Sequence, residues 1–386
     1  MKTRRIPIAL IFCAALAAET APGPSPAEIS IRKAQEQIAK QPEHYPYYNA
    51  LAMAYARRAR ETSDVSYYDK AEETLQKSFA IAPDNYEGKK VETWLLLGRH
   101  DFANARLAAQ KLNRQMPDDV TVYGYLVDAN AELGNYAEAA KAAQWMLDLR
   151  PGNVAGLTRA AYLRELHGDL PGAMELMQMA YDATPFQEFE DRAWLLTQLA
   201  HLNWVAGDSK KSESYANGAL GLFPEYHYAL GVLGQIRMAQ GRTEEAVMLF
   251  QKRYAAAPHA ENLYAVGEAL AQAGRSAEAE KVFGEFEKAS LAESGMTDNS
   301  NHELIAYYTD YAKEPAKALH VAEQEIARRR DVYTVDAYAW ALAAAGDYAR
   351  AQEEMQKALA FGVKDPKVLR HAEAIAAHVG VQRASR

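Results

Sequence analysis

The sequence has a single cysteine, Cys13, which lies within its first seventeen residues. If that segment is removed, the rest of the chain has no thiol, which excludes disulfides, a cysteine nucleophile and a thiolate metal site. The ten histidines show no metal-ligand spacing. His302 and Glu303 begin like the zinc-protease motif, but Ala306 stands where the second histidine is required. We therefore predict no metal, no cofactor and no catalytic residues, and hence no enzyme.

Blocks of one charge and long apolar runs are missing as well. The formal net charge is −8, with acidic and basic residues interspersed, so no basic stretch could neutralise the backbone of a nucleic acid. No apolar run is long enough to cross a bilayer. We therefore expect neither a nucleic-acid partner nor a transmembrane segment.

The N-terminal stretch MKTRRIPIALIFCAALA has the three parts of a secretory signal. Basic residues stand at its start, residues 6–16 are apolar, and Ala15 and Ala17 form a small-x-small cleavage site. We predict a signal peptide over residues 1–17, cleavage after Ala17, and export to the periplasm or the medium. The alternative is that these residues are an amphipathic start to the first helix.

Cys13 has a second interpretation, as the lipid acceptor of a lipoprotein signal. Such a signal has a small residue directly before the cysteine, whereas this chain has Phe12. We therefore expect no lipid anchor at Cys13, although an acylated chain would be attached to a membrane. The oligomeric state is left open by the sequence.

The main body of the sequence is a repeat. Prolines at positions 117, 151, 185, 224 and 258 are separated by 34, 34, 39 and 34 residues. A period of 34 with two helical patterns in each unit is typical of tetratricopeptide repeats. The chain resembles this family, and its clearest unit carries the motif residues Leu230, Leu233, Gly234, Gly241, Ala246, Phe250 and Pro258.

Two small residues recur in most of the units for different physical reasons. Glycine accepts the left-handed conformation at the end of the first helix, and we assign this role to Gly134, Gly168, Gly207, Gly241, Gly274 and Gly346. Alanine allows two helices to cross closely, and we assign that role to Ala139, Ala173, Ala246, Ala279 and Ala351. Because one unit cannot bury its apolar faces alone, neighbouring units must stack.

The predicted fold is therefore all-α: a right-handed α-solenoid of about nine tandem helix-turn-helix units with a C-terminal capping helix. The predicted segments are a signal peptide (1–17), a linker with a leading helix (18–44), the repeat array (45–365), and the capping helix with its tail (366–386).

Four places depart from the repeat pattern. The first unit has an enlarged turn (57–70), Lys89 replaces an apolar residue in the second unit, residues 187–192 lengthen one interval, and a polar break occupies residues 291–301. We also interpret the run ARRRD at 327–331 as a solubilising surface, or as a set of cations that neutralise the carbonyl ends of second helices.

In this family the first helices line a concave groove that binds peptides. The resemblance places ten residues of this chain there as candidate partner-binding residues: Trp94, Tyr125, Asp128, Arg159, Tyr162, Trp194, Gln198, His201, Tyr228 and Gln235. Aromatic bodies with polar tips suit a surface that binds extended peptides or sugars. The alternative is that several of the aromatic residues, the tryptophans above all, are core residues that close the seam between neighbouring first helices.

The predicted function is that of a non-enzymatic scaffold in the cell envelope or the secreted fraction, which binds a protein or peptide in its groove. The alternative is a repeat protein that binds a small molecule or a glycan at the aromatic centre of the groove. A protein-binding groove should be continuous over several units, whereas a ligand site should be one pocket with convergent polar groups, expected around Arg159, Tyr162, Gln198 and His201.

Overall fold

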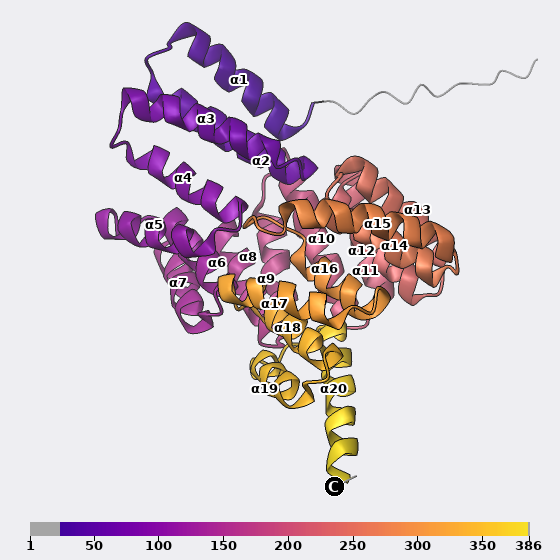
Figure 1. Ribbon diagram of the computed structural model, residues 1–386. Coiled ribbons are helices and arrows are strands. Elements are labelled where there is room, and N and C mark those ends of the chain that lie inside the picture. Colours follow the sequence, from indigo (N-terminus) through magenta and orange to yellow (C-terminus); the bar gives the residue numbers. More distant parts are fainter. Residues whose placement is uncertain (1–23, 385–386) are drawn as a thin grey trace, which may run out of the picture.

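The computed structural model describes residues 24–384, and the predicted signal peptide and Cys13 lie outside this range. Within it all regular structure is helical (Figure 1). The first ten helices are α1 (Pro26–Lys40), α2 (Tyr45–Thr62), α3 (Ser66–Ile81), α4 (Tyr86–Gly98), α5 (Phe102–Gln115), α6 (Val120–Glu132), α7 (Tyr136–Leu149), α8 (Val154–Leu166), α9 (Leu170–Ala183) and α10 (Phe189–Val205). The rest are α11 (Ser209–Leu222), α12 (His227–Ala239), α13 (Thr243–Ala256), α14 (Ala260–Gln272), α15 (Ser276–Glu293), α16 (Asn301–Ala306), the π-helix η1 (Tyr307–Tyr311), α17 (Pro315–Arg328), α18 (Val332–Ala344), α19 (Tyr348–Leu359) and α20 (Pro366–Ala384).

Consecutive helices pack in pairs, from α2 with α3 to α18 with α19. These pairs coincide with the nine predicted units, and α1 precedes them while α20 follows. The prediction of an all-α solenoid with tandem helix pairs and a terminal helix is thus confirmed. Lys89 does not disturb the second unit, because it lies on α4 and its ammonium group reaches the Asp84 carboxylate at 3.1 Å.

The small residues have the roles that the sequence indicates. The six turn glycines all have positive φ, between 71° and 88°. The five crossing alanines are at most 3% exposed, so a larger side chain at any of them would push two helices apart. Local backbone demands and packing therefore fix the helix pair as the repeating unit.

The eighth unit is irregular. Its first helix changes from α-helical to π-helical geometry at Tyr307, and the turn that follows has Lys313, with φ of 56°, in place of a glycine. A π-helical turn carries one extra residue per hydrogen-bonded ring and often marks a functional position. Here it directs Asp310 toward Trp340 of α18, whose indole N–H donates a 2.8 Å hydrogen bond to that carboxylate.

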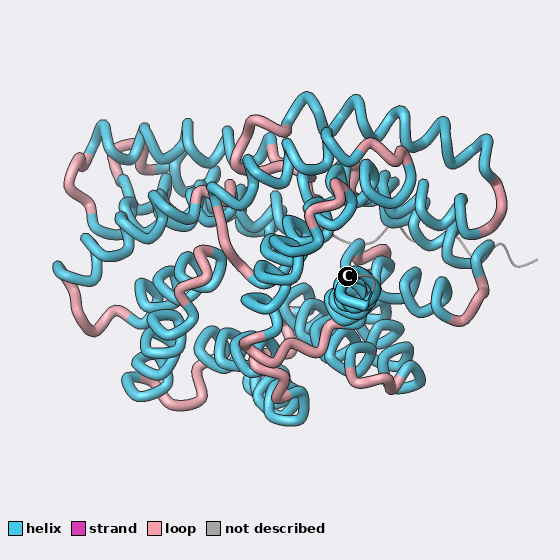
Figure 2. The backbone as a smooth tube through the Cα atoms, turned by 60° about the horizontal axis from the view of Figure 1, so that its bottom comes forward, coloured by secondary structure: helices cyan, strands magenta, loops and turns pink. Residues whose placement is uncertain are grey.

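The array curls so far that its later units contact its earlier ones. In Figure 1 α17 lies beside α6, while α20 extends away from the other helices, and Figure 2 views α20 nearly end-on. One hydrophobic cluster joins residues of α6–α8, such as Val127 and Leu163, to residues of the last four units, such as Val332 and Leu342. The superhelix is therefore closed on itself, with side chains of both halves inside it.

Candidate functional site

The ten predicted groove residues lie on the first helices of five consecutive units, α4, α6, α8, α10 and α12. Their aromatic members pack against the hydrophobic clusters to different extents. Tyr125 is 4% exposed and belongs to a core cluster, and Trp94, Tyr162, Trp194 and Tyr228 are half-buried against such clusters. Gln198 is half-buried and Gln235 is exposed.

The charged members of the set are bound to partners in neighbouring units. Arg159 Nη2 donates to Asp128 Oδ2 at 2.5 Å, and its Nε donates to the carbonyl of Gly124 at 3.1 Å. These contacts tie α8 to α6, so both charges hold adjacent units together. The Arg159 side chain as a whole is 23% exposed.

His201 forms a similar bridge one unit further on. Its Nε2 lies 2.7 Å from Oε1 of Glu165, which joins α10 to α8. Burial lowers the pKa of His201, but the hydrogen bond and the negative charge of Glu165 outweigh it, so the pKa is raised. Four residues were expected to converge on a ligand. His201 is engaged in a bridge, Tyr162 packs against a cluster and Gln198 is half-buried. Arg159 lines a cavity.

That cavity, of about 590 Å³, lies where α6, the end of α7 and the start of α8 meet. Two predicted residues, Tyr125 and Arg159, line it together with Arg150. The other lining residues are Val120, Thr121, Gly124, Met146, Pro151, Gly152, Asn153, Val154, Ala155 and Ala183. The wall thus combines apolar side chains with two guanidinium groups and has no carboxylate, which suits a segment that carries an acidic group.

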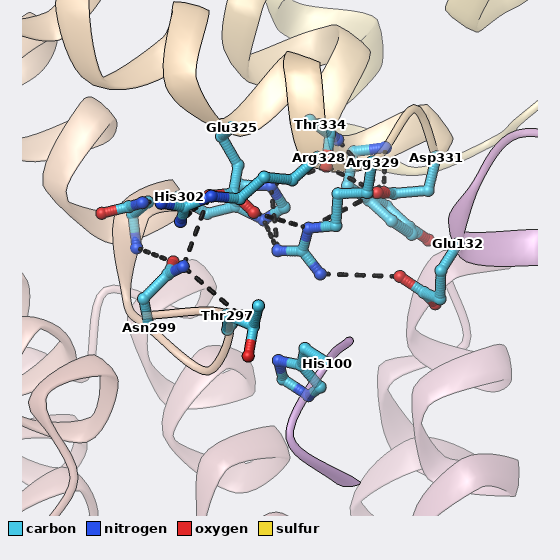
Figure 3. Close-up of polar contacts among 12 residues, drawn as sticks. His100, Glu132, Thr297, Asn299, His302, Glu325, Arg328, Arg329, Asp331 and Thr334 are labelled. Carbon is cyan, nitrogen blue, oxygen red and sulfur yellow. Dashed lines mark hydrogen bonds and ion pairs between the residues drawn. The ribbon is translucent and has the colours of Figure 1, made fainter. Parts of the chain in front are cut away.

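The residues that close the superhelix form a second polar region, drawn in Figure 3. Arg329, after α17, donates to Glu325 Oε1 at 2.9 Å and lies 3.5 Å from Glu132 Oε2 of α6. The amide of Arg330 donates to the carbonyl of Glu132 at 3.1 Å, and the amide of Val332 donates to the Tyr136 hydroxyl at 2.8 Å. Two backbone amides and one ion pair thus fasten the eighth and ninth units to the third.

His302 is one of the two histidines labelled in Figure 3, and its surroundings favour the neutral ring. Burial and the charge of Arg329 lower the pKa of His302 to about 3. A neutral ring has one nitrogen that accepts, and Arg329 Nη2 lies 3.2 Å from Nε2 and 3.4 Å from Nδ1. The zinc-protease fragment at this position is therefore part of a structural network.

The arginines of the run 327–331 make different contacts. Arg328 donates to the carbonyls of Ser294, Gly295 and Met296 at 2.8–3.2 Å, just beyond the end of α15. This confirms that the run caps a second helix with cations. The solubilising interpretation is wrong for Arg329, whose side chain is 15% exposed, because it lies between two halves of the superhelix.

A further closure joins the first unit to the fifth. On α2, Arg57 and Arg60 face a cluster of acidic side chains at the start of α10. One member of this cluster, Glu190, is completely buried. Arg57 Nη2 lies 3.0 Å from Glu188 Oε2, and Arg60 Nη2 lies 2.6 Å from Asp191 Oδ1 and also contacts Glu190. The Tyr226 hydroxyl donates to Glu190 Oε1 at 2.7 Å.

These closing residues were not among the predicted site residues, although the sequence carries a signal for them. Arg57 and Arg60 fall in the predicted enlarged turn 57–70, although that prediction is too wide, because α2 continues to Thr62 and α3 begins at Ser66. The acids fall in the extra residues 187–192, and Arg329 and Arg330 belong to the arginine run. The polar break takes part as well, since Asp298 Oδ1 lies 3.5 Å from His100 Nδ1.

In the part of the chain that the structure describes, no group of three or more His, Cys, Asp or Glu side chains could hold a metal ion. No helix within residues 24–384 is long and apolar enough to cross a membrane.

Comparisons with known proteins agree with this architecture. The sequence model of the tetratricopeptide repeat matches residues 94–154, 126–188 and 197–261, so this part of the chain consists of tetratricopeptide repeats. No curated protein matches the sequence.

Solved structures with the same kind of solenoid align over most of the chain. A chain of the APC/C hetero-tetramer Cut9–Hcn1 has 12% identity and a TM-score of 0.50, with 89% of this chain and 59% of that chain covered. Human IFIT1, in a dimer with m7Gppp-AAAA, has 12% identity and a TM-score of 0.54, with 85% and 84% covered. The human IFIT1 dimer with PPP-AAAA has 13% identity and a TM-score of 0.53, with 86% and 88% covered. At these identities the likeness shows the fold alone.

Proposed function

We propose that this protein is a non-enzymatic scaffold that binds another protein or a peptide at the first-helix face of its third and fourth units. Proteins built from tetratricopeptide repeats generally mediate protein–protein interactions, and the fold provides the rigid, preformed surface that such recognition needs. The observation that carries the proposal is the cavity of about 590 Å³, which is lined by two residues that the repeat pattern predicts for the groove, Tyr125 and Arg159.

The chemistry of the cavity indicates what part of a partner would enter it. Arg150 is exposed and offers its guanidinium group to a carboxylate, whereas Arg159 is already paired with Asp128 and donates to the carbonyls of Gly124 and Ala155. Val120, Met146 and Val154 supply apolar contact beside it. An extended segment with an acidic side chain or a terminal carboxylate, followed by an apolar residue, matches this wall.

Photo-crosslinking in the cells that make the protein tests this proposal. The photoreactive residue replaces Thr121, which is exposed and lines the cavity, and in the control it replaces Lys252, which is exposed on α13. The proposal expects a protein captured from position 121 only, and Arg150→Glu should abolish that capture. If both positions capture the same proteins, or neither captures any, the scaffold proposal is refuted and a small molecule or a glycan becomes the better candidate.

We further propose that the protein acts outside the cytoplasm, after cleavage of residues 1–17. The charge pattern and the small-x-small site at Ala15 and Ala17 support this. N-terminal sequencing of the protein from fractionated cells should give a chain that begins at Ala18. A cytoplasmic protein that retains Met1 or Lys2 at its end would contradict export.

A further inference from the structure

A separate cavity, of about 360 Å³, lies at the C-terminal end of the array between η1, α18 and α20. Asp310 and Lys313 line it on one side, and Trp340 and Tyr348 on another. Small and apolar residues, among them Ala344 and Ile375, complete the wall. It shares no residue with the cavity near α6 and α8.

The aromatic wall of this cavity is held rigidly. The Trp340 ring stacks on the His371 ring at 4.3 Å with an angle of 3° between the planes, and both Asp336 oxygens lie 3.0 Å from His371 Nδ1. The Trp340 indole N–H also donates to Asp310. A ring fixed on one face and at its edge is preorganised for contact with a ligand.

The Asp310 carboxylate is the distinctive charge of the cavity. Only its Oδ1 is occupied by the indole N–H. Lys313 is a second charge on the wall, but its ammonium group is held at a backbone carbonyl and not at Asp310. Lys313 Nζ donates to the carbonyl of Thr309 at 3.2 Å, and Lys317 Nζ lies 2.6 Å from Glu314 and 3.5 Å from Glu287. A carboxylate with spare acceptor capacity beside aromatic rings favours a cation, through a charge-assisted hydrogen bond and cation–π attraction.

We propose that this cavity binds the side chain of a lysine or arginine that a polypeptide partner presents. The volume accommodates one long side chain, the alanines and Ile375 contact its aliphatic stem, and Asp310 accepts hydrogen bonds from its head. Because the Lys313 ammonium group lines the same cavity, the cationic head of the bound side chain lies at Asp310 and away from Lys313. The inference rests on the proposed function in one respect only, that the ligand is part of a polypeptide.

The indole N–H of Trp340 provides a direct reporter, since it points at Asp310. Its resonance in a nitrogen–proton NMR spectrum of the full chain is assigned by its disappearance in Trp340→Phe. The probes are the pentapeptide acetyl-Gly-Ala-Arg-Ala-Gly-amide and the same peptide with citrulline. Citrulline keeps the shape of arginine but has a carbonyl oxygen in place of one NH2 group, so it has no charge and fewer N–H donors. N-acetyl-arginine amide serves as the small free cation.

The proposal expects a saturable shift of the Trp340 resonance with the arginine peptide and an affinity at least tenfold weaker for the citrulline peptide. Asp310→Asn, which keeps the acceptor for the indole, should weaken the arginine peptide to a similar extent. Ala344→Phe, at an exposed position, should block the cavity without loss of fold, and it provides the test if Asp310→Asn does not fold.

Equal binding of the arginine and citrulline peptides, or no change in the variants, would overturn the assignment of a cation site. If N-acetyl-arginine amide binds as tightly as the pentapeptide, the site takes a small free cation and the polypeptide partner is wrong. Because Thr121 lies in the other cavity, failure of the crosslinking test and failure of this one are told apart.

Discussion

Replacing Gly134 by alanine is expected to loosen the contact between the third unit and the last two. Gly134 has a φ of +74°, and a Cβ there would lie 2.6 Å from the carbonyl oxygen of Arg330. Gly241 occupies the same place in the sixth unit, with a φ of +71° and nothing within 4 Å of its Cβ position. Gly241→Ala is therefore a matched control that has the conformational strain without the clash.

The difference between the two variants can be estimated. Each alanine in the left-handed conformation costs roughly 1 kcal/mol. In Gly134→Ala the backbone of Arg330 must also move, which breaks the hydrogen bond from its amide to Glu132 and disturbs the one from Val332 to Tyr136. At about 1 kcal/mol for each bond, we expect Gly134→Ala to lower the free energy of unfolding by about 2 kcal/mol more than Gly241→Ala.

Urea unfolding measures the total loss, and hydrogen exchange shows where it occurs. The amides of Arg330 and Val332 should exchange faster in Gly134→Ala and at the wild-type rate in Gly241→Ala. Equal losses of stability in the two variants, with unchanged exchange at both amides, would refute the reasoning that the later units are fastened at Gly134.

Three other perturbations follow from the packing and charges. Arg60→Met should lower the free energy of unfolding in urea by about 3 kcal/mol, because it removes a partner of the buried Glu190 carboxylate. The control Arg99→Met, at a mostly exposed ion pair, should lower it by under about 1 kcal/mol. Equal losses in the two variants would contradict the α2–α10 closure. Ala246→Leu should force α12 and α13 apart and speed hydrogen exchange in units five to seven more than at the ends, and a uniform increase over the whole chain would contradict quasi-independent repeats. Burial lowers the pKa of His227 from 6.5 to about 4. Between these two pH values the ring takes up a proton in the unfolded chain but stays neutral in the folded one. The stability of the fold therefore falls as the pH is lowered from 6.5 to about 4. His227→Phe should remove about 2.5 kcal/mol of the difference in unfolding free energy between pH 7 and pH 4.5, and an unchanged difference would show that the ring is not buried in its neutral form.

The repeating part of the fold could be predicted because each unit makes the same local demands. The 34-residue period places the helix pairs, and residues such as Gly241 and Ala246 mark the turn and the crossing within one unit. These features depend on residues that are close in sequence, so a single sequence shows them. The same logic located the first-helix face and, on it, two residues of the larger cavity.

The closure of the superhelix could not be predicted in the same way, because it depends on the summed curvature of all nine units. Gly134 and Gly241 are equivalent in the sequence, yet a later segment crosses near Gly134 and not near Gly241. Likewise Asp128 and Arg159 were chosen as charges facing the groove, and the sequence did not show that each is the partner of the other across two units. One interruption of the repeat was an available sign, since residues 187–192 supply the acids that bind α2. The arginine run 327–331, which fastens α6, does not interrupt the repeat pattern.

The closed superhelix is most directly tested by a distance between its two halves. Spin labels at Ala103 and Thr297, both exposed and close to the contact of His100 with Asp298, are introduced as cysteines in a chain with Cys13→Ser, and electron–electron double resonance measures their separation. The closed arrangement predicts one narrow distribution near the short limit of the method, which broadens in Arg329→Ala. A long or broad distribution in the otherwise unaltered chain would show that the solenoid is open and that the contacts between its halves do not hold in solution.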